Sequence, residues 1–368
     1  MTRWTRFALA LALALPAVAQ AAGGMSTGTP DIKFAGPLTF GPHGVLFVGD
    51  PTSAAVFAIE TKDSQGIANA KAVNVEGLDA KVAALLGTTT TDIAINDLAV
   101  NPVNGRVYLS VSRGQGPEAK PVILTIDGDG KISQLSLENV TFAKAELPNA
   151  PAAPAAAAAP AQPGRRARNP RAESITDMAF IDGKLIIAGL SNEEFASKLR
   201  SIPYPFETVG AGTSIEIYHA AHAAYETRSP VRTFATYNIG STPHLLAAYT
   251  CTPLVKIPMA KLSSSEKVMG DTVAELGSGN QPLDMIVYQK GGKDFVLMSN
   301  SRHGVMKVAL EKVADIESLK EPVSGTAGLP FEKIAAEGVV QLDRLNANQA
   351  VMLVRNDAGL KISTMDLP

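Results

Sequence analysis

Three aspartates recur at the same place in a repeated segment, directly before a short run of mostly apolar residues. They are Asp97, Asp177 and Asp284. If these segments are equivalent strands around one axis, the three carboxylates converge there, with Asn96 beside them. Carboxylate and amide oxygens are ligands of hard cations such as Ca²⁺, so the pattern predicts a site for Ca²⁺ or another divalent metal. The same side chains could instead accept backbone N–H bonds in the turns that enter the strands, and the sequence leaves both interpretations open.

The single cysteine offers a second kind of chemistry. Cys251 lies in Tyr249-Thr-Cys-Thr-Pro253, a predicted hairpin tip, and His303 occupies the corresponding place in the next hairpin. A thiolate beside an imidazole could attack a substrate or bind a soft metal such as copper. The alternative is that Cys251 is a small side chain packed among apolar neighbours.

His219 and His222 are a further candidate metal pair, because a separation of three residues would put both rings on one face of a helix. The residues just before them, Ser214-Ile-Glu-Ile-Tyr218, have the composition of a strand. We therefore expect a strand end followed by an exposed turn rather than a helix.

Polar residues at other predicted hairpin tips should share a face with the three aspartates. Convergent polar groups at a central, concave position are the default hypothesis for a binding site. The predicted ligand-binding face comprises Asn96, Asp97, Asp177, Glu193, Cys251, Asp284, Arg302 and His303. The sequence has no His-Glu-x-x-His motif, and we assign no catalytic residue. Binding is therefore expected more than catalysis.

The elements that must position these residues are six copies of one paired-strand segment. Each copy has two runs of mostly apolar residues, and the stretch between them varies in length from copy to copy. The copies span 45–59, 107–126, 185–218, 245–257, 295–308 and 351–363. Such a hairpin buries its apolar face only by stacking on its neighbours, which is typical of propeller blades. The sequence predicts an all-β, six-bladed β-propeller, with seven blades as the alternative.

Three further features complete the predicted architecture. A C-terminal strand at 360–366 should complete the first blade and remove the last open sheet edge. Short helices are expected at 79–86 and 192–199, where apolar residues fall at helical spacing. Residues 144–172 are rich in Ala, Pro and Arg, which predicts a disordered insertion between blades.

The N-terminal residues have the pattern of a secretory signal. Arg3 and Arg6 precede an apolar run over 7–18, and Ala19-Gln-Ala21 has the form that signal peptidase cleaves. We expect 1–21 to be a signal peptide, 22–368 to form a single propeller domain, and the protein to be periplasmic or secreted. The apolar run is too short to span a bilayer as a helix, so no membrane insertion is expected.

Composition narrows the class of partner. The formal net charge is −2, and loss of Arg3 and Arg6 without any acidic residue would change it to −4. Such a balance gives no electrostatic reason to bind nucleic acid. A single cysteine excludes an intramolecular disulfide. The expected partner is an unidentified protein or a small molecule.

Two segments carry a resemblance to known propellers. They resemble the repeats of secreted NHL, YVTN and gluconolactonase-like propellers. The first is Asp97-Leu-Ala-Val-Asn-Pro followed by Gly105-Arg-Val-Tyr-Leu-Ser-Val, and the second is Asp177-Met-Ala-Phe followed by Gly183-Lys-Leu-Ile-Ile-Ala-Gly. The resemblance covers most of the mature chain at the level of the fold.

That resemblance implies a hydrolase of lactones or esters that holds a calcium-type ion in its central channel. A rigid repeat core with variable hairpin tips and no recognisable catalytic set indicates instead a scaffold that binds a ligand or a protein. Lactonase-type relatives place a Glu ligand at the start of the first inner strand, where this chain has Gly36-Pro37. The binding scaffold is therefore our expectation, and the hydrolase is the alternative.

Overall fold

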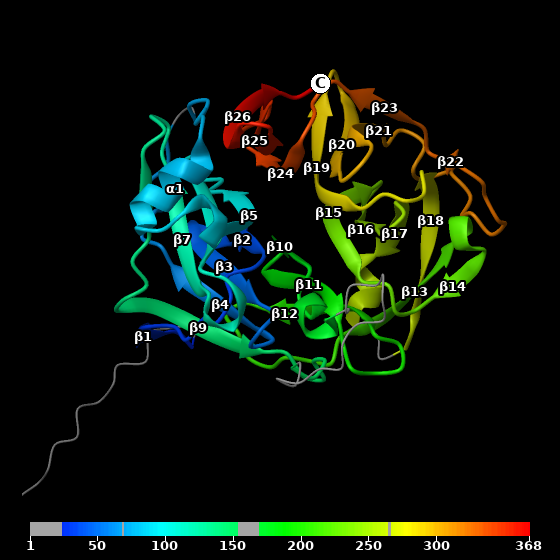
Figure 1. Cartoon of the computed structure of the whole chain (residues 1–368). Coiled ribbons are helices and arrows are strands. Elements are labelled where there is room, and N and C mark those ends of the chain that lie inside the picture. Colours follow the sequence, from blue (N-terminus) through cyan, green and yellow to red (C-terminus); the bar gives the residue numbers. More distant parts are fainter. Residues whose placement is uncertain (1–23, 68–69, 154–168, 264–265) are drawn as a thin grey trace, which may run out of the picture.

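A computed structural model of the chain describes residues 24–67, 70–153, 169–263 and 266–368. These residues form an all-β ring of six blades around a central axis (Figure 1). The predicted β-propeller is confirmed, with six blades rather than seven. The predicted signal peptide at 1–21 lies outside the described residues, as does 154–168 of the predicted insertion.

Blade 1 is built from separated parts of the chain. From the axis outward its strands are β2 (Leu38–Phe40), β3 (Val45–Asp50), β4 (Ala55–Glu60), β9 (Val140–Glu146) and β1 (Ser26–Gly28). Blade 2 contains β5 (Ile93–Val100), β6 (Val107–Arg113), β7 (Lys120–Ile126) and β8 (Ile132–Gln134). The chain leaves blade 1 after β4, forms blade 2, and returns to blade 1 with β9. Residues 144–146 of the predicted insertion are therefore strand.

Blades 3 and 4 are joined into one sheet. Blade 3 contains β10 (Asp177–Ile181), β11 (Lys184–Leu190), β12 (Ser197–Pro203) and β13 (Thr213–His219), with β14 (Ala224–Glu226) at its edge. Blade 4 contains β15 (Val231–Ile239), β16 (Thr242–Tyr249), β17 (Pro253–Pro258) and β18 (Val268–Leu276), with β22 (Thr326–Gly328) at its edge. The outer strands β13 and β18 pair in parallel, so each covers an edge of the other.

Blades 5 and 6 complete the ring. Blade 5 contains β19 (Pro282–Lys290), β20 (Lys293–Asn300), β21 (Gly304–Ala309) and β23 (Phe331–Ile334). Blade 6 contains β24 (Val339–Arg344), β25 (Gln349–Asn356) and β26 (Gly359–Asp366).

The outer edge of blade 6 is covered by the segment that leaves blade 1. Val75 forms a bridge with Ile362 of β26. The Thr364 hydroxyl accepts a hydrogen bond from Val73 N at 2.8 Å and donates one to Val73 O at 2.9 Å. The prediction that 360–366 completes the first blade was wrong. β26 is the third strand of blade 6, and the crossing segment removes its open edge instead.

Of the two predicted helices, one is confirmed. Helix α1 (Leu78–Leu86) buries Leu78, Val82 and Leu86. The predicted helix at 192–199 is wrong, because its last residues begin β12, which pairs with β11 over its full length. Tertiary pairing here outweighs the local spacing of apolar residues. Short 3-10 helices occupy Pro42–Gly44, Thr90–Asp92, Gly116–Glu118, Pro170–Glu173, Ala220–His222 and Met259–Ser263.

The blades follow one another around the axis in an order that differs from the sequence. The inner strands touch in the order β5, β2, β10, β15, β19 and β24, and β24 returns to β5. Blade 1 therefore lies between blades 2 and 3, and blade 2 lies against blade 6. In Figure 1 the cyan strands of blade 2 accordingly lie beside the red strands of blade 6.

The core is divided into six apolar clusters, one at each contact between neighbouring blades. Strand β3 illustrates how one strand serves two of them. Val45 and Phe47 pack in the cluster with blade 3, whereas Leu46 and Val48 pack in the cluster with blade 2. Since side chains alternate along a strand, each middle strand supplies both contacts of its blade. The ring is therefore held by burial between blades.

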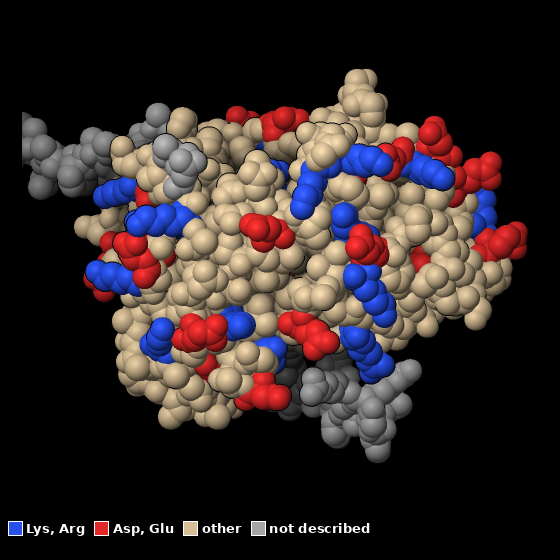
Figure 2. Space-filling model, turned by 90° about the horizontal axis from the view of Figure 1, so that it is seen from above, with Lys and Arg blue, Asp and Glu red and all other residues tan. Residues whose placement is uncertain are grey.

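The surface has no large region of one charge sign on the face drawn in Figure 2, where basic and acidic side chains are interspersed. No helix in the described part of the chain has the length and apolar character needed to cross a bilayer.

Replacing Thr364 by Val tests the contact that covers blade 6. The variant keeps the shape of the side chain but loses both hydrogen bonds to Val73. We expect the free energy of unfolding, measured by urea denaturation, to fall by about 1–3 kcal/mol because a backbone donor and acceptor lose their partner. Ser363→Ala is the control and should change it by less than about 0.5 kcal/mol. Equal effects of the two substitutions would refute this role.

Candidate functional site

Four aspartates of the inner strands line the axis, and we call them the carboxylate ring. They are Asp97 of β5, Asp177 of β10, Asp284 of β19 and Asp343 of β24. The first three were predicted to converge. Asp343 was not, because it stands at the end of its strand in Val-Val-Gln-Leu-Asp343 and lacks the following apolar-Ala pattern. Its position before the sixth hairpin was the signal that could have identified it.

Each member of the carboxylate ring holds the inner strand of a neighbouring blade. Asp97 Oδ2 accepts the N–H of Leu38 at 2.7 Å, which joins blade 2 to blade 1, and Asp177 Oδ2 accepts that of Phe234 at 2.7 Å, which joins blade 3 to blade 4. Asp284 Oδ2 accepts the N–H of Leu342 at 2.9 Å, which joins blade 5 to blade 6, and Asp343 Oδ2 accepts that of Val100 at 2.7 Å, which joins blade 6 to blade 2. The carboxylates are therefore structural links. They accept backbone N–H bonds, as the second interpretation expected, but the donors lie in the inner strands of neighbouring blades and not in the turns that enter the strands.

In three of the four aspartates the other carboxylate oxygen bonds to the aspartate's own strand. Oδ1 of Asp177, Asp284 and Asp343 accepts the N–H of the following residue at 2.7, 2.8 and 2.6 Å. These three carboxylates thus use both oxygens on backbone donors. Such donors are fixed by the sheets, so the ring is rigid.

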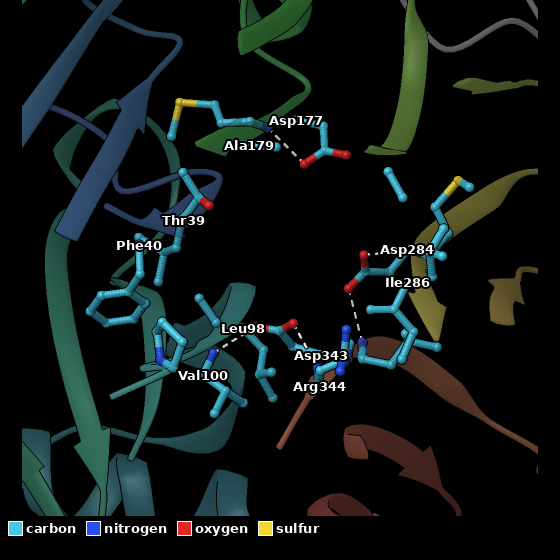
Figure 3. Close-up of a pocket in the computed structure, with 18 of the residues that line it drawn as sticks. Thr39, Phe40, Leu98, Val100, Asp177, Ala179, Asp284, Ile286, Asp343 and Arg344 are labelled. Atoms are coloured by element: carbon cyan, nitrogen blue, oxygen red, sulfur yellow. Dashed lines mark hydrogen bonds between the residues drawn. The ribbon is translucent and has the colours of Figure 1, made fainter. Parts of the chain in front are cut away.

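A cavity of about 650 Å³ lies along the axis, and all six inner strands contribute to its lining. Figure 3 shows Thr39, Phe40, Ala179 and Ile286 around this cavity, together with the carboxylates of Asp177, Asp284 and Asp343. On the other side of the carboxylate ring the axial space is only about 60 Å³.

Gln341 narrows the axis at that second side. With its amide nitrogen toward the carboxylates, its side chain donates to Asp284 Oδ2 at 2.8 Å and to Asp97 Oδ1 at 3.3 Å. The wide cavity is lined by the ends of the inner strands and by the turn at 345–347. The hairpin tips lie near the starts of those strands, as the pairing of Ile93 with Arg113 illustrates. The main cavity therefore opens on the face opposite the predicted one.

Burial changes the ionisation of the carboxylate ring. It raises the pKa of Asp177 to about 7 and that of Asp343 to about 6, against the lowering effect of the backbone hydrogen bonds. Burial, and then repulsion from the neighbouring carboxylates, raise the pKa values of Asp97 and Asp284 well above their usual range. The ring consequently carries fewer than four negative charges near neutral pH.

The structure separates the predicted ligand-binding face into two groups. Asp97, Asp177 and Asp284 line the axial cavity, and Asn96 lies on its narrow side, where it donates to Ala35 O at 2.8 Å and Ser112 Oγ at 2.9 Å. The residues predicted at hairpin tips do not line either axial space.

The tip residues have other neighbours. Glu193 forms an ion pair with Lys198 and accepts a hydrogen bond from Asn149 at 2.9 Å. Arg302 and His303 line a hollow of about 570 Å³ between blades 5 and 6. These residues therefore do not share a site with the carboxylate ring.

Cys251 lies at a hairpin tip, between β16 and β17, as predicted, but its neighbours are not the expected ones. Its thiol lies with ring nitrogens of His219 and His222, all within 4.8 Å of one another. Among the described residues this is the group of three or more His, Cys, Asp or Glu side chains close enough to hold a metal ion, and His303 is not part of it. Sequence reasoning named all three residues but did not bring them together.

No protein-family model matches the sequence, and no curated protein matches it significantly. Among solved structures the chain is similar to the PQQ-bound aldose sugar dehydrogenase from Streptomyces coelicolor, at 14% identity and a TM-score of 0.35, covering 93% of this chain and 99% of that chain. It is also similar to an engineered GH43 glycoside hydrolase, at 8% identity and a TM-score of 0.36, covering 75% of this chain and 52% of the other.

The chain thus spans about half the length of that glycoside hydrolase. The β-propeller fold stands, whereas neither comparison places the chain in the NHL, YVTN or gluconolactonase-like type. Similarity at this level carries no argument about activity.

Replacing Asp177 by Asn tests the structural role of the carboxylate ring. The carboxyl group keeps an acceptor on each oxygen even when it is protonated, whereas the NH2 of an amide only donates, so either Met178 N or Phe234 N loses its partner. At pH 5 we expect the free energy of unfolding, measured by urea denaturation, to fall by about 1–3 kcal/mol. Asp182→Asn, in an exposed turn, is the matched control and should have an effect below about 0.5 kcal/mol.

Comparison of Asp177→Asn with wild type at several pH values tests the ionisation of Asp177. Its pKa is raised from 3.8 to about 7 in the folded protein, so its contribution to stability is complete below about pH 4 and is lost as the pH rises through 7. Asp177→Asn lacks this contribution, and the difference in unfolding free energy from wild type should narrow between pH 5 and pH 8. A difference that is constant over this range would contradict the raised pKa.

Proposed function

We propose that this chain is a periplasmic or secreted β-propeller that binds a small polar ligand in its axial cavity. The observation that carries the proposal is the cavity of about 650 Å³, to which every blade contributes. Pockets for small molecules measure about 300–1,000 Å³ and lie where elements converge. The cavity favours a small molecule over a protein partner, since it is concave and enclosed by the ring.

The lining indicates the chemistry of the ligand. Phe40, Val100 and Ile286 contribute apolar surface, and the carboxylate ring contributes acceptor oxygens on one side. A carboxylate oxygen has a second lone pair after it accepts one backbone bond. Ligands that carry several hydroxyl or amine donors, such as polyols, sugars or alkylamines, match this lining.

Substitutions of Thr39 test this proposal, because its side chain faces the cavity (Figure 3). Thr39→Phe should fill part of the cavity, whereas Thr39→Val keeps the volume and serves as the control. We would screen monosaccharides, polyols and alkylamines by thermal unfolding. A ligand at 100 times its Kd adds about 2.7 kcal/mol of stability, which shifts Tm by a few degrees.

We expect the Tm increase in wild type and in Thr39→Val, and its loss in Thr39→Phe. Compounds that stabilise all three proteins equally would place their binding outside the cavity. Failure of every compound in these classes to stabilise wild type would likewise count against the proposal.

A calcium-dependent hydrolase of lactones or esters is the second candidate. It is favoured by the repulsion between carboxylates, which adds to burial in raising the pKa values of Asp97 and Asp284, because a bound divalent cation would relieve that repulsion. Against it, three of the four carboxylates already use both oxygens on backbone donors.

Calcium titration separates the two candidates. We expect millimolar Ca²⁺ to leave the Tm of wild type and of Asp284→Asn unchanged, and we expect no hydrolysis of simple lactones. A calcium-induced rise in Tm that Asp284→Asn removes, together with lactone hydrolysis that EDTA abolishes, would support the hydrolase instead.

A further inference from the structure

We propose that His219, His222 and Cys251 bind one thiolate- and imidazole-preferring transition-metal ion, zinc or copper, at the junction of blades 3 and 4. This site lies at the outer part of the ring and does not depend on the axial cavity. His219 ends β13, His222 ends the following 3-10 helix, and Cys251 lies in the turn between β16 and β17. The ligands thus come from two blades.

The parallel pairing of β13 with β18 explains why these distant residues meet. It places the end of blade 3 along the outer edge of blade 4, whose own hairpin carries Cys251. Glu275 of β18 then accepts the backbone N–H groups of Ala220 and Ala221, at 2.8 and 3.3 Å. The segment that carries the two histidines is therefore fixed to the same blade as the cysteine.

Glu226 orients both imidazole rings. Its Oε1 lies 3.1 Å from Nδ1 of His219 and 2.6 Å from Nδ1 of His222. A carboxylate only accepts, so each ring donates from Nδ1, and each Nε2 is left with a lone pair. Metal-binding histidines usually donate their other ring N–H to a carboxylate in this way. The second carboxylate oxygen of Glu226 accepts from the Ser229 hydroxyl, which fixes its orientation.

His219 supplies an independent observation that points to a ligand. Its side chain is 1% exposed, and its Nε2 has no hydrogen-bond partner in the described structure. A buried polar atom without a partner costs free energy. Coordination of an ion by this nitrogen would satisfy it.

The spacing suits coordination. The three ligand atoms lie within 4.8 Å of one another. Around a tetrahedral ion, Zn–N distances of about 2.0–2.1 Å and Zn–S distances of about 2.3 Å put the ligand atoms about 3.3–3.6 Å apart. Where a pair of ligand atoms is wider than this, the half-exposed His222 side chain has room to move closer, together with Glu226.

The turn that carries Cys251 is already in place. Cys251 and Thr252 both have left-handed backbone conformations, with φ of 67° and 63°. Cys251 N donates to Asn280 O at 2.7 Å, and the Thr252 hydroxyl donates to Gly277 O at 2.8 Å. The backbone of this turn is thus held by the segment between β18 and β19, independently of the histidines.

The donor set selects the class of metal. Two imidazoles and one thiolate suit zinc and copper, whereas calcium and magnesium prefer oxygen ligands. Three protein ligands leave one position of a tetrahedral ion for water or a small molecule, as in catalytic zinc sites. The ion would also tie blades 3 and 4 together.

Cobalt is the probe for the geometry. We would titrate reduced, full-length protein with Co²⁺ and record the absorption of the thiolate-to-cobalt charge transfer, and then displace it with Zn²⁺. We expect one equivalent of Co²⁺, and we expect Cys251→Ser and His222→Ala to weaken binding at least 100-fold, with the charge-transfer band absent in Cys251→Ser. Glu226→Gln should weaken binding by about 10–100-fold and keep the band, because it orients the ligands without touching the ion.

His303→Ala is the control, since it removes a histidine outside the group, and it should leave Co²⁺ binding unchanged. Circular dichroism would establish that each variant is folded. Should a variant fail to fold, protection of Cys251 in wild type against iodoacetamide by stoichiometric Zn²⁺ tests the same contact. Competition between Zn²⁺ and Cu⁺, with metal analysis of protein from its native cells, would identify the ion.

Two results would overturn the proposal. One is a wild-type protein that binds none of Co²⁺, Zn²⁺ and Cu⁺ in stoichiometric amount. If Cys251 of that protein is also alkylated rapidly, and this depends on His222, the thiol is a nucleophile and not a metal ligand. The other is binding that Cys251→Ser and His222→Ala leave unchanged.

Discussion

The hydrogen bond from a backbone N–H of one inner strand to an aspartate of the next blade is the contact on which the centre of this ring depends. Each inner strand pairs with a strand of its own blade on one edge only. Backbone N–H groups on its other edge, which faces the axis, need other acceptors. Four carboxylates provide them at four of the six contacts between blades. The same bonds link neighbouring inner strands, and Gln341 lies on the narrow side of the axis, opposite the wide cavity.

Apolar side chains buried between neighbouring blades also hold the ring together, and the path of the chain connects blades that are distant in the sequence. Strand β9, which follows blade 2 in the sequence, pairs with β4 and β1, so blade 1 combines segments from before and after blade 2. The segment around Val73 then covers blade 6, whose last strand is also the last strand of the chain. Residues of this segment and of helix α1 pack in one apolar cluster with blades 2 and 6, which joins early and late parts of the sequence.

The two places where chemistry can occur have different physical characters. The axial cavity is lined by carboxylates whose raised pKa values reflect burial and mutual repulsion, and its oxygens suit ligands that donate hydrogen bonds. The group at His219, His222 and Cys251 has nitrogen and sulfur donors at the outer junction of two blades. A ligand at one place does not require the other, so the two proposals can be tested separately.

The sequence by itself determined the all-β propeller, helix α1 and the placement of Asp97, Asp177 and Asp284 on inner strands, because these follow from the spacing of side chains within a short stretch. It did not reveal the order of the blades, the strand at β12 or the role of Asp343. It also paired Cys251 with His303, whereas the fold groups it with His219 and His222. Those features were decided by the tertiary structure, since they depend on which distant strands bury their apolar faces against each other, and a local pattern carries no information about that choice.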